Sequence, residues 1–516
     1  MIKRRLYLII RKFILIYLSV FPGKLKFQLL SGLNFKKLDF NNYEKNKNLI
    51  FKKDFFKNEN NPIVYNYDFI NLCNKLGGKR GIEIAKLGIS QWYEINKFKA
   101  YRMWDSEQTA KRVLNLVYNF DFINSISTKA DDHRLKQILK ININAFNRFI
   151  FPKKISQYSL LELKVYILIK YILGEEALNI KDKFEEILDN QVDNFSMHKS
   201  YNIFEQAKFL NDINEIISML LNFNSEAPEI FSLTKMKMEA VLAQYFHKDG
   251  TVALFNGTNN SNLEKIKLAF SEEQNIRKIK FPNDNNGIFY FEDKHKKIFF
   301  DAVQPTNSIQ SKRLSAGTLS FEFSADKEKI ITNCGALERN TGNAAYLRYS
   351  AAHSTIILEN TNISEIRENQ PHIKFPQSVS IKKQEGVSKH TIEVSHNGYI
   401  RNYKKIVKRK ISFEENKGYL LGEDSVISAT SKNKEVVFHI RFHILPNINI
   451  TQTNSKKNII LKTKNNAIWL FKANYDLVLE ESVFMDKNNV KETKQIVIKG
   501  ITKQSREKIQ WSLTKK

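Results

Sequence analysis

Four residues that could do chemistry lie within nine positions of one another: Asn194, His198, Tyr201 and Asn202. Histidine and tyrosine are residue types that move protons in catalysis, and amide side chains donate hydrogen bonds to anionic groups. A further tyrosine, Tyr245, follows about forty residues later along the chain. The residue types therefore fit a site that binds a carboxylate and removes a proton, although aromatic residues in such places more often pack.

A second group of candidate residues lies in the C-terminal half. Arg348 could bind an anionic sugar or a structural carboxylate, and His353 follows it by five positions. His353 could act in a site or orient the backbone. Asn256 stands beside Gly257 in a turn-rich stretch. These residues must be brought to the first group by the fold.

The elements before about residue 242 are predicted to be helices. Apolar residues recur there at spacings of three and four, as in Phe69–Leu76 and Leu160–Ile172, with short polar connectors between segments. Consecutive antiparallel helices of this length make a bundle, a solenoid or an (α/α) toroid. Periodicity alone does not choose among the three.

After about Asn256 the pattern changes to short strands separated by Lys, Asn and Gly turns. Strands at this spacing predict a large antiparallel β-sandwich. The predicted strands are 287–291, 297–300, 318–323, 354–358, 403–411, 436–442, 459–461, 467–471 and 495–498. The predicted organisation is a helical domain over 60–270 and a sandwich domain over 285–516.

Composition indicates a globular protein of roughly two domains. The chain has 516 residues, 42% of them hydrophobic, and a net charge of +28. Such a charge fits an anionic partner, but Lys and Asn are frequent everywhere, as coding bias would produce. No nucleic-acid-binding motif occurs, so nucleic acid is not an expected partner. The two cysteines, Cys73 and Cys334, exclude a disulfide framework.

Residues 1–33 are basic and apolar in alternation, with Arg11 and Lys12 splitting the apolar run. The segment resembles a signal peptide in charge order, but no small-residue cleavage site follows, and its apolar run Phe13–Phe21 is too short to span a bilayer. A basic amphipathic helix with peripheral membrane contact is the alternative. Expected locations are the cell envelope or periplasm, or otherwise the cytoplasmic side in association with the membrane.

The order of several motifs resembles the heparinase II/III-like family of polysaccharide lyases. The motifs run through roughly residues 65–510, and their shared order carries the resemblance. They are 67–70 with Trp92 and Trp104, 191–202, 248–250, 255–257, 316–321, 333–335, 348–355, 395–399, 422–424, 441–443, 479–483 and 495–497.

The resemblance implies an N-terminal (α/α) helical toroid followed by a β-sandwich, and β-elimination of a uronate-containing anionic polysaccharide in the cleft between them. Such a lyase must neutralise the carboxylate, remove the C5 proton and protonate the leaving O4. The resemblance places a catalytic histidine at His198. Tyr201 or Tyr245 could serve as the catalytic tyrosine, and His353, in a matching motif, could take part in the site or orient the backbone. Substrate binding falls to Asn194, Asn202, Asn256 and Arg348. His198 and Asn202 would otherwise be residues that start or cap a helix.

Two departures from the family pattern favour a second hypothesis. No tyrosine follows the turn Asp249–Gly250, and Ser315 stands where the family has a histidine. The alternative function is therefore a catalytically degenerate protein that binds a polysaccharide or takes part in assembling a cell-surface polymer. The polymer, endo or exo action and the oligomeric state cannot be read from the sequence.

Metal binding is not expected. Some relatives hold zinc through two histidines and an aspartate, and the corresponding places here are Ser315 or Ala316, Asn333, and His396. One such ligand does not hold a zinc ion, which needs about four donors. No cofactor motif is present either.

Overall fold

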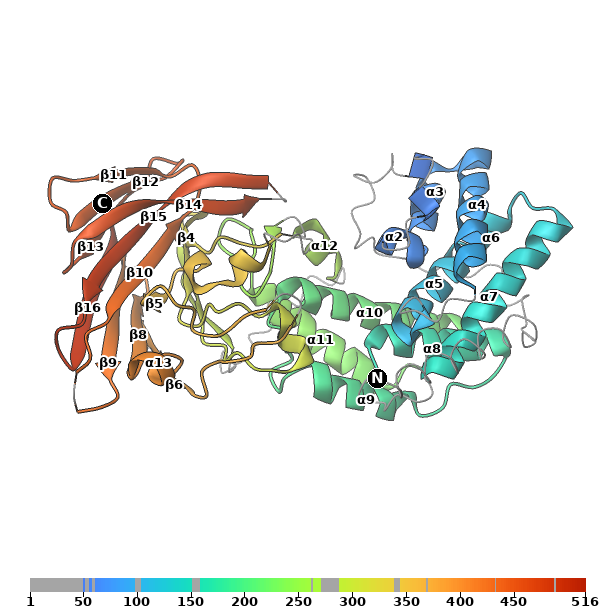
Figure 1. Cartoon of the computed structure of the whole chain (residues 1–516), viewed down its shortest axis with the longest axis horizontal. Coiled ribbons are helices and arrows are strands. Elements are labelled where there is room, and N and C mark those ends of the chain that lie inside the picture. Colours follow the sequence, from blue (N-terminus) through green and yellow to red (C-terminus); the bar gives the residue numbers. More distant parts are fainter. Residues whose placement is uncertain are drawn as a thin grey trace. The chain divides into compact units, whose positions relative to one another are not determined.

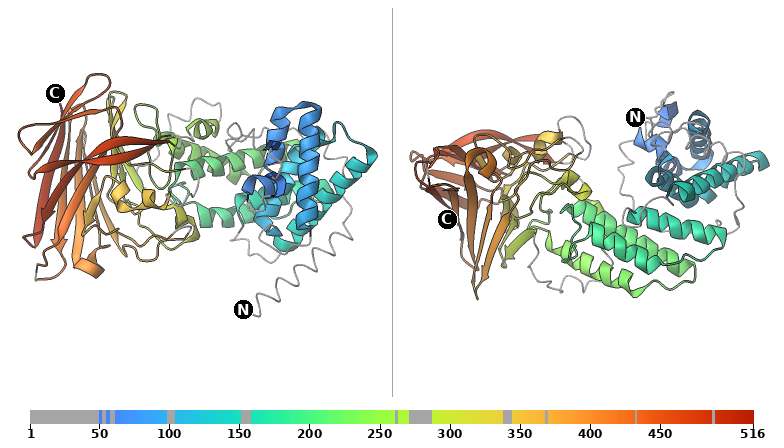
Figure 2. Two further views of the ribbon diagram at one scale, coloured as in Figure 1. Left: turned by 45° about the horizontal axis from the view of Figure 1, so that its top comes forward. Right: turned by 60° about the horizontal axis from the view of Figure 1, so that its bottom comes forward.

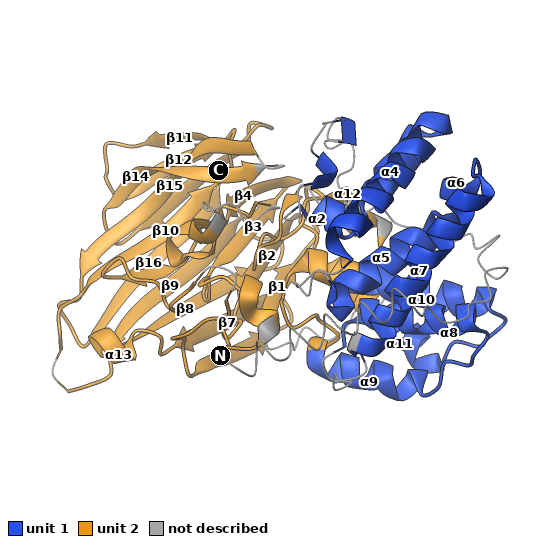
Figure 3. Ribbon diagram, turned by 45° about the vertical axis from the view of Figure 1, so that its right-hand side comes forward, with its two compact units in different colours: residues 1–190, 209–235 blue, residues 191–208, 236–516 orange. Residues whose placement is uncertain are grey.

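The protein is described here from a computed structural model. It describes residues 50–51, 55–57, 61–97, 104–150, 158–260, 263–270, 287–337, 344–367, 370–431, 433–486 and 489–516. The segment 1–33, predicted as signal-like or amphipathic, lies outside these residues. The chain forms two compact units, residues 1–190 with 209–235 and residues 191–208 with 236–516 (Figure 3).

Helices make up the first unit, and some helical residues belong to the second unit. Figure 1 labels the helices. In the described residues they are α2 (Pro62–Tyr65), α3 (Phe69–Leu76), α4 (Gly78–Asn96), α5 (Ser106–Tyr118), α6 (Phe120–Asn124), α7 (Lys129–Ile150), α8 (Leu160–Leu173), α9 (Ile180–Gln191), α10 (Ile203–Asn222), α11 (Glu229–Gln244) and α12 (Leu263–Leu268). Helices α10 and α11 lie side by side (Figure 2), where the Gln206 amide donates to the carbonyl of Met238 at 3.3 Å.

The ends of α8 show how the sequence sets a helix. Ser159 and Glu162 form a reciprocal capping box at its start, and Gly174 adopts a left-handed conformation at its end. The interior of the first unit also holds charge. The Arg112 guanidinium is buried over the rings of Trp92 and Trp104, at 4.5 and 4.8 Å, so aromatic faces stabilise it.

Two antiparallel sheets form most of the second unit, which confirms the predicted order of helices followed by a β-sandwich. The first sheet has the order β1-β2-β3-β4-β10-β15-β14, with β5 paired to β10. Its strands are β1 (Ile288–Glu292), β2 (Lys296–Asp301), β3 (Phe321–Ala325), β4 (Glu328–Thr332), β5 (Ile356–Leu358), β10 (Val437–Ile444), β14 (Leu477–Asp486) and β15 (Asn489–Ile501).

The second sheet has the order β11-β12-β13-β16-β9-β8-β7-β6. Its strands are β6 (Val379–Glu385), β7 (Lys389–His396), β8 (Lys405–Glu414), β9 (Tyr419–Ser428), β11 (Asn449–Gln452), β12 (Asn458–Lys462), β13 (Ile468–Ala473) and β16 (Arg506–Lys515). Aromatic side chains from both sheets meet in the core, where Trp511 stacks on Phe321 at 5.4 Å. A buried ion pair, Arg409 with Asp424, spans β8 and β9 at 2.6 Å.

Two predicted strands begin later than the sequence indicates, for a shared reason. The strand predicted from Thr318 starts at Phe321, because Leu319 has a positive φ of 74°. The strand predicted from Tyr403 starts after Lys404, whose φ is 55° and which ends the short helix α13 (Ile400–Tyr403). Strand propensity does not predict a positive φ at residues other than glycine, such as Leu319 and Lys404.

Within the described residues, no helix is both long and apolar enough to cross a membrane.

Candidate functional site

His198 lies in the segment between α9 and α10, where a short bridge joins it to Val192. Its Nδ1 is 2.7 Å from the Ser200 hydroxyl, and its backbone N–H donates to the Gln206 side chain at 2.7 Å. The ring is half-buried. Burial lowers the pKa of His198 to about 4. Glu205 opposes this shift, whereas Lys208 and Arg313 act in the same direction as burial. The imidazole is therefore neutral at pH 7, the form that can accept a proton.

Asn202 joins this segment to a loop distant in sequence. Its Oδ1 caps α10 by accepting from the N–H groups of Phe204 and Glu205, at 2.9 and 3.0 Å. Its Nδ2 donates to the carbonyl of Asn256 at 2.8 Å. The side chain is fully buried, so it serves as both a helix cap and a bridge.

Asn256 extends the bridge to Ser315. Its Oδ1 accepts from the Ser315 N–H at 3.1 Å, while its Nδ2 is buried without a hydrogen-bond partner. Asn256 has φ 52°, a conformation that asparagine tolerates better than most residues. The predicted residues Asn202 and Asn256 are thus in contact with each other, and Asn256 also contacts Ser315. Asn194 is exposed on the His198 segment.

His353 lies beyond Ser315, at the end of the short 3-10 helix Ser350–Ala352. A Cβ on Gly317 would come within 3.1 Å of the His353 ring, so the glycine allows close packing. The ring is 3% exposed, and neither nitrogen makes a hydrogen bond of normal geometry. Burial lowers its pKa to about 4, against an opposing effect of Glu322. His353 is neutral and enclosed.

Arg348 lies near the same stretch, at the end of the 3-10 helix Ala344–Arg348. Its Nε donates to the carbonyl of Leu314 at 3.0 Å and its Nη1 to that of Arg367 at 3.3 Å. Its Nη2 is buried without a partner. Burial lowers the pKa of this guanidinium to about 10, against an opposing effect of Tyr349, and no carboxylate in the described part of the chain forms an ion pair with it. Such a group can take an anion.

Neither candidate tyrosine is set up as a phenolate. The Tyr201 ring fills the space left by Gly287, where a Cβ would lie 2.2 Å away. Burial raises the pKa of Tyr201 well above its usual value, and the nearby carboxyl of Asp193 raises it further. Tyr245 is fully enclosed, stacks on Phe299 at 6.0 Å, and has a hydroxyl without a partner. Burial also raises its pKa.

A buried carboxylate network next to these residues was not predicted from the sequence. Glu322 accepts hydrogen bonds from His247 and Lys329, each at 3.0 Å, and from three further groups. The signal was available, because Glu322 stands between Phe321 and Phe323 in an apolar strand and a buried charge requires partners. Asp301 was missed too; burial raises its pKa to about 7, and it lies near both tyrosines.

The residues compared with a zinc site have other roles here. His396 is buried, and its Nδ1 accepts from the Gly398 N–H at 3.2 Å. The Asn333 side chain accepts from the Ser354 N–H at 3.0 Å. In the residues for which the structure gives positions, no group of three or more His, Cys, Asp or Glu side chains is arranged to hold a metal ion.

The arrangement links His198, through Ser200, Asn202 and Asn256, to Ser315, and the stretch 314–317 then contacts Arg348 and His353. Its reactive features are the neutral, half-buried imidazole of His198 and the guanidinium of Arg348, for which the described residues provide no carboxylate partner. The combination can bind an anionic ligand and exchange a proton.

Comparisons with known proteins agree with this architecture. Residues 278–512 match the family described as Heparinase II/III-like, C-terminal. The chain is 21% identical over 310 residues to the FtsZ-localized protein C of Caulobacter vibrioides (strain NA1000 / CB15N). That match covers 56% of this chain and 53% of the relative, so the chain spans about half the length of the curated relative it matches.

Solved structures share the fold at low identity. A crystal structure of heparinase III is 12% identical to this chain. The match covers 97% of this chain and 88% of the heparinase III chain, with a TM-score of 0.68. The crystal structure of the heparan sulfate lyase HepC from Pedobacter heparinus is 13% identical. The match covers 98% of this chain and 83% of the HepC chain, with a TM-score of 0.62. Residues 278–512 thus match the C-terminal domain of the heparinase II/III-like family, and the chain shares the fold of heparinase III.

Proposed function

We propose that the protein binds a uronate-containing anionic polysaccharide and cleaves it by β-elimination at the surface that carries His198. The observation that carries the proposal is the neutral, half-buried imidazole of His198, which Ser200 and Gln206 hold in place. The fold, shared with proteins named heparinase III and heparan sulfate lyase, supports the same reaction class.

In this reaction His198 takes the C5 proton through Nε2, the ring nitrogen that does not face Ser200. The C5–H electron pair forms the C4–C5 double bond, and the C4–O4 bond breaks. The imidazolium then returns the proton to O4, so no second acid is needed. Arg313, whose exposed guanidinium is ion-paired with Glu205 at 2.7 Å, lies close enough to lower the pKa of His198. It exchanges Glu205 for the uronate carboxylate when the substrate binds.

The test is the ultraviolet absorbance of the unsaturated uronate product, with alginate, heparan-type, chondroitin-type and bacterial uronic polymers as substrates. We expect a rise with the unaltered protein and none with His198→Ala. The matched control is His295→Ala, since His295 is an exposed histidine with a side chain 58% exposed. An equal rise in both variants would show that His198 is not the base.

A second candidate function is polysaccharide binding without cleavage, or a role in assembling a cell-surface polymer. It is favoured by the two enclosed tyrosines, whose raised pKa values oppose phenolate formation, and by Ser315 in place of histidine. One relative is named for where it is localised rather than for a reaction, so the family match does not choose between the two. Retained binding with no absorbance change in any polymer supports this candidate.

We also propose that the protein works in the cell envelope or periplasm, or at the cytoplasmic membrane surface, where residues 1–33 would make the contact. The basic and apolar character of that segment supports this location. Fractionation of cells that make the full chain, compared with a chain lacking residues 1–33, tests it. Recovery of both in the same soluble fraction would contradict membrane contact.

A further inference from the structure

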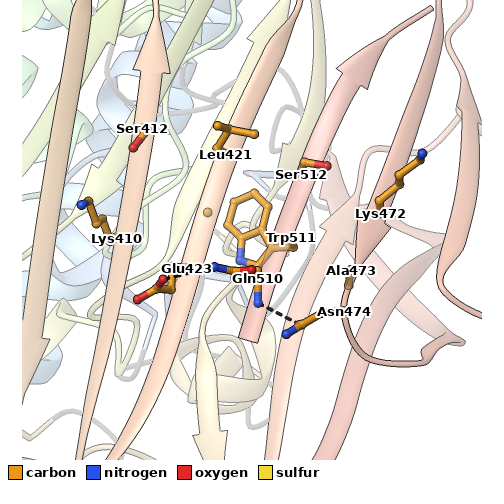
Figure 4. A pocket seen from close by; sticks show the side chains of 11 residues that line it. Lys410, Ser412, Leu421, Glu423, Lys472, Ala473, Asn474, Gln510, Trp511 and Ser512 are labelled. Carbon is orange, nitrogen blue, oxygen red and sulfur yellow. Dashed lines mark hydrogen bonds between the residues drawn. The ribbon is translucent and has the colours of Figure 1, made fainter. Parts of the chain in front are cut away.

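A hollow of about 570 Å³ lies on the second sheet (Figure 4). None of the site residues predicted from the sequence lines it. The strands that form it are β8, β9, β16 and β13, which are neighbours in the sheet. The hollow therefore rests on paired strands rather than on loops, and its shape is set by the sheet.

Two rows of side chains cross these strands. The first row runs from Lys410 through Glu423 and Gln510 to Asn474, just after β13. The second runs from Ser412 through Leu421 and Ser512 to Lys472. Because strands lie about 4.8 Å apart, each row spans on the order of 14 Å. This length suits a short oligosaccharide better than a single sugar ring.

Core packing on the other face of the sheet holds the strands that form the hollow. Gly422 and Trp511 alternate with the row residues and point into the core, where Trp511 is 3% exposed. A Cβ on Gly422 would lie 2.1 Å from the Trp511 ring. The Trp511 indole N–H also donates to Asp424 at 3.0 Å. This packing prevents the rows above it from shifting easily.

The side chains that face the hollow match an acidic sugar chain. Lys410 and Lys472 are exposed, and no carboxylate in the described chain forms an ion pair with either. Hydroxyl and amide groups lie between them, and Leu421, 43% exposed, offers an apolar contact for the face of a sugar ring. The one carboxylate, Glu423, is near Gln510 at 3.5 Å and Arg506 at 4.0 Å, and it can accept from sugar hydroxyls.

We propose that this hollow is a second binding site for an acidic oligosaccharide, separate from the surface that carries His198. The inference rests on the proposed function only for the class of polymer. The two lysines at opposite ends of the rows bind carboxylates of the sugar chain, and the amides and hydroxyls between them bind its hydroxyl groups. Such a site would hold a long polymer without taking part in its cleavage.

The test is the affinity of the full chain for alginate oligosaccharides, measured by titration calorimetry, in the double variant Lys410→Ala, Lys472→Ala. We expect the affinity to fall about tenfold, because two charge-assisted contacts are lost. The control double variant Lys464→Ala, Lys494→Ala removes the same charge from exposed lysines outside the hollow. It should keep its affinity within about twofold. An uncharged glucan should not bind in either variant.

The outcomes separate this inference from the proposed function. Equal losses in the two double variants would mean general charge attraction and would overturn the site. Unchanged affinity in Lys410→Ala, Lys472→Ala, with affinity lost in His198→Ala, would also overturn it and leave the proposed function standing. Loss of affinity in the hollow variant, with no unsaturated product from any polymer, would support the site while the lyase proposal fails. Absence of binding by the unaltered protein would overturn the inference outright.

Discussion

The side-chain amide of Asn202 donates to the backbone carbonyl of Asn256 at 2.8 Å, although the two residues are 54 positions apart. Asn202 also caps α10, and Asn256 holds the backbone of Ser315. One buried amide thus fixes a helix start and the loop that leads to Ser315. The position of His198 depends on the same contact, because Ser200 lies between His198 and Asn202.

Replacing Asn202 should therefore destabilise the second unit. Asn202→Ala removes the cap and the bridge, and we expect the free energy of unfolding to fall by about 1–3 kcal/mol. Asn202→Asp keeps the cap but sets a carboxylate against the carbonyl of Asn256, so it should also destabilise. Denaturant unfolding measures both. The control is Asn194→Ala, at an exposed position, which should be neutral; destabilisation equal to that of Asn202→Ala would remove the special role of Asn202.

The order of elements was predictable because the apolar spacing changes from three or four residues to two, and each spacing belongs to one type of element. The cap by Asn202 was also foreseen as an alternative to ligand binding. The bridge to Asn256 could not be predicted, since it depends on a contact across 54 residues. The packing of His353 on Gly317 likewise depends on a contact between residues far apart in the sequence.

The two tyrosines should respond differently to loss of the hydroxyl. The Tyr245 hydroxyl is buried without a partner, so Tyr245→Phe should leave stability unchanged or raise it by up to about 1 kcal/mol. The Tyr201 hydroxyl faces Asp193, so Tyr201→Phe should lower stability slightly. Thermal unfolding and the absorbance assay are run on both variants. Loss of product formation in Tyr245→Phe, with stability retained, would assign Tyr245 a catalytic role against this expectation.

Glu322 should be essential for stability. It is fully buried and neutralises Lys329, so Glu322→Ala leaves an uncompensated buried charge and should cost about 3–5 kcal/mol. Burial alone would raise the pKa of Glu322, but Lys329 and His247 lower it to about 2. The ordinary pKa of a glutamate is about 4.5. The contribution of Glu322 to the free energy of unfolding is therefore complete above about pH 4.5 and is lost as the pH falls toward 2.

Glu322→Gln keeps the shape and tests the charge. We expect it to be destabilised at pH 7 and to lose the part of the pH dependence between about 4.5 and 2. Glu481→Gln, at an exposed position on β14, is the matched control and should behave as the unaltered protein. If Glu322→Gln unfolds at the same denaturant concentration as that control, the negative charge of Glu322 contributes nothing to stability.

Acid should destabilise the fold before Glu322 is protonated, because several histidines are buried in the neutral form. Burial lowers the pKa of His353 to about 4, and that of His396 and His443 to about 3, from an ordinary value of 6.5. Between pH 6.5 and 4 the unfolded chain binds protons that the folded chain does not, so the free energy of unfolding falls as the pH falls. Each such histidine contributes about 1.4 kcal/mol per pH unit in this range.

His396 offers the clearest measurement, because burial alone causes its shift. In His396→Asn, which retains a side chain able to accept from the Gly398 N–H, the dependence of unfolding free energy on pH should weaken by one proton. The control His295→Asn, at an exposed histidine, should keep the full dependence. Denaturant unfolding at a series of pH values between about 7 and 4 gives the slopes. Equal slopes in the two variants would mean that His396 takes up its proton as readily in the folded protein as in the unfolded chain, contrary to its enclosure between the sheets.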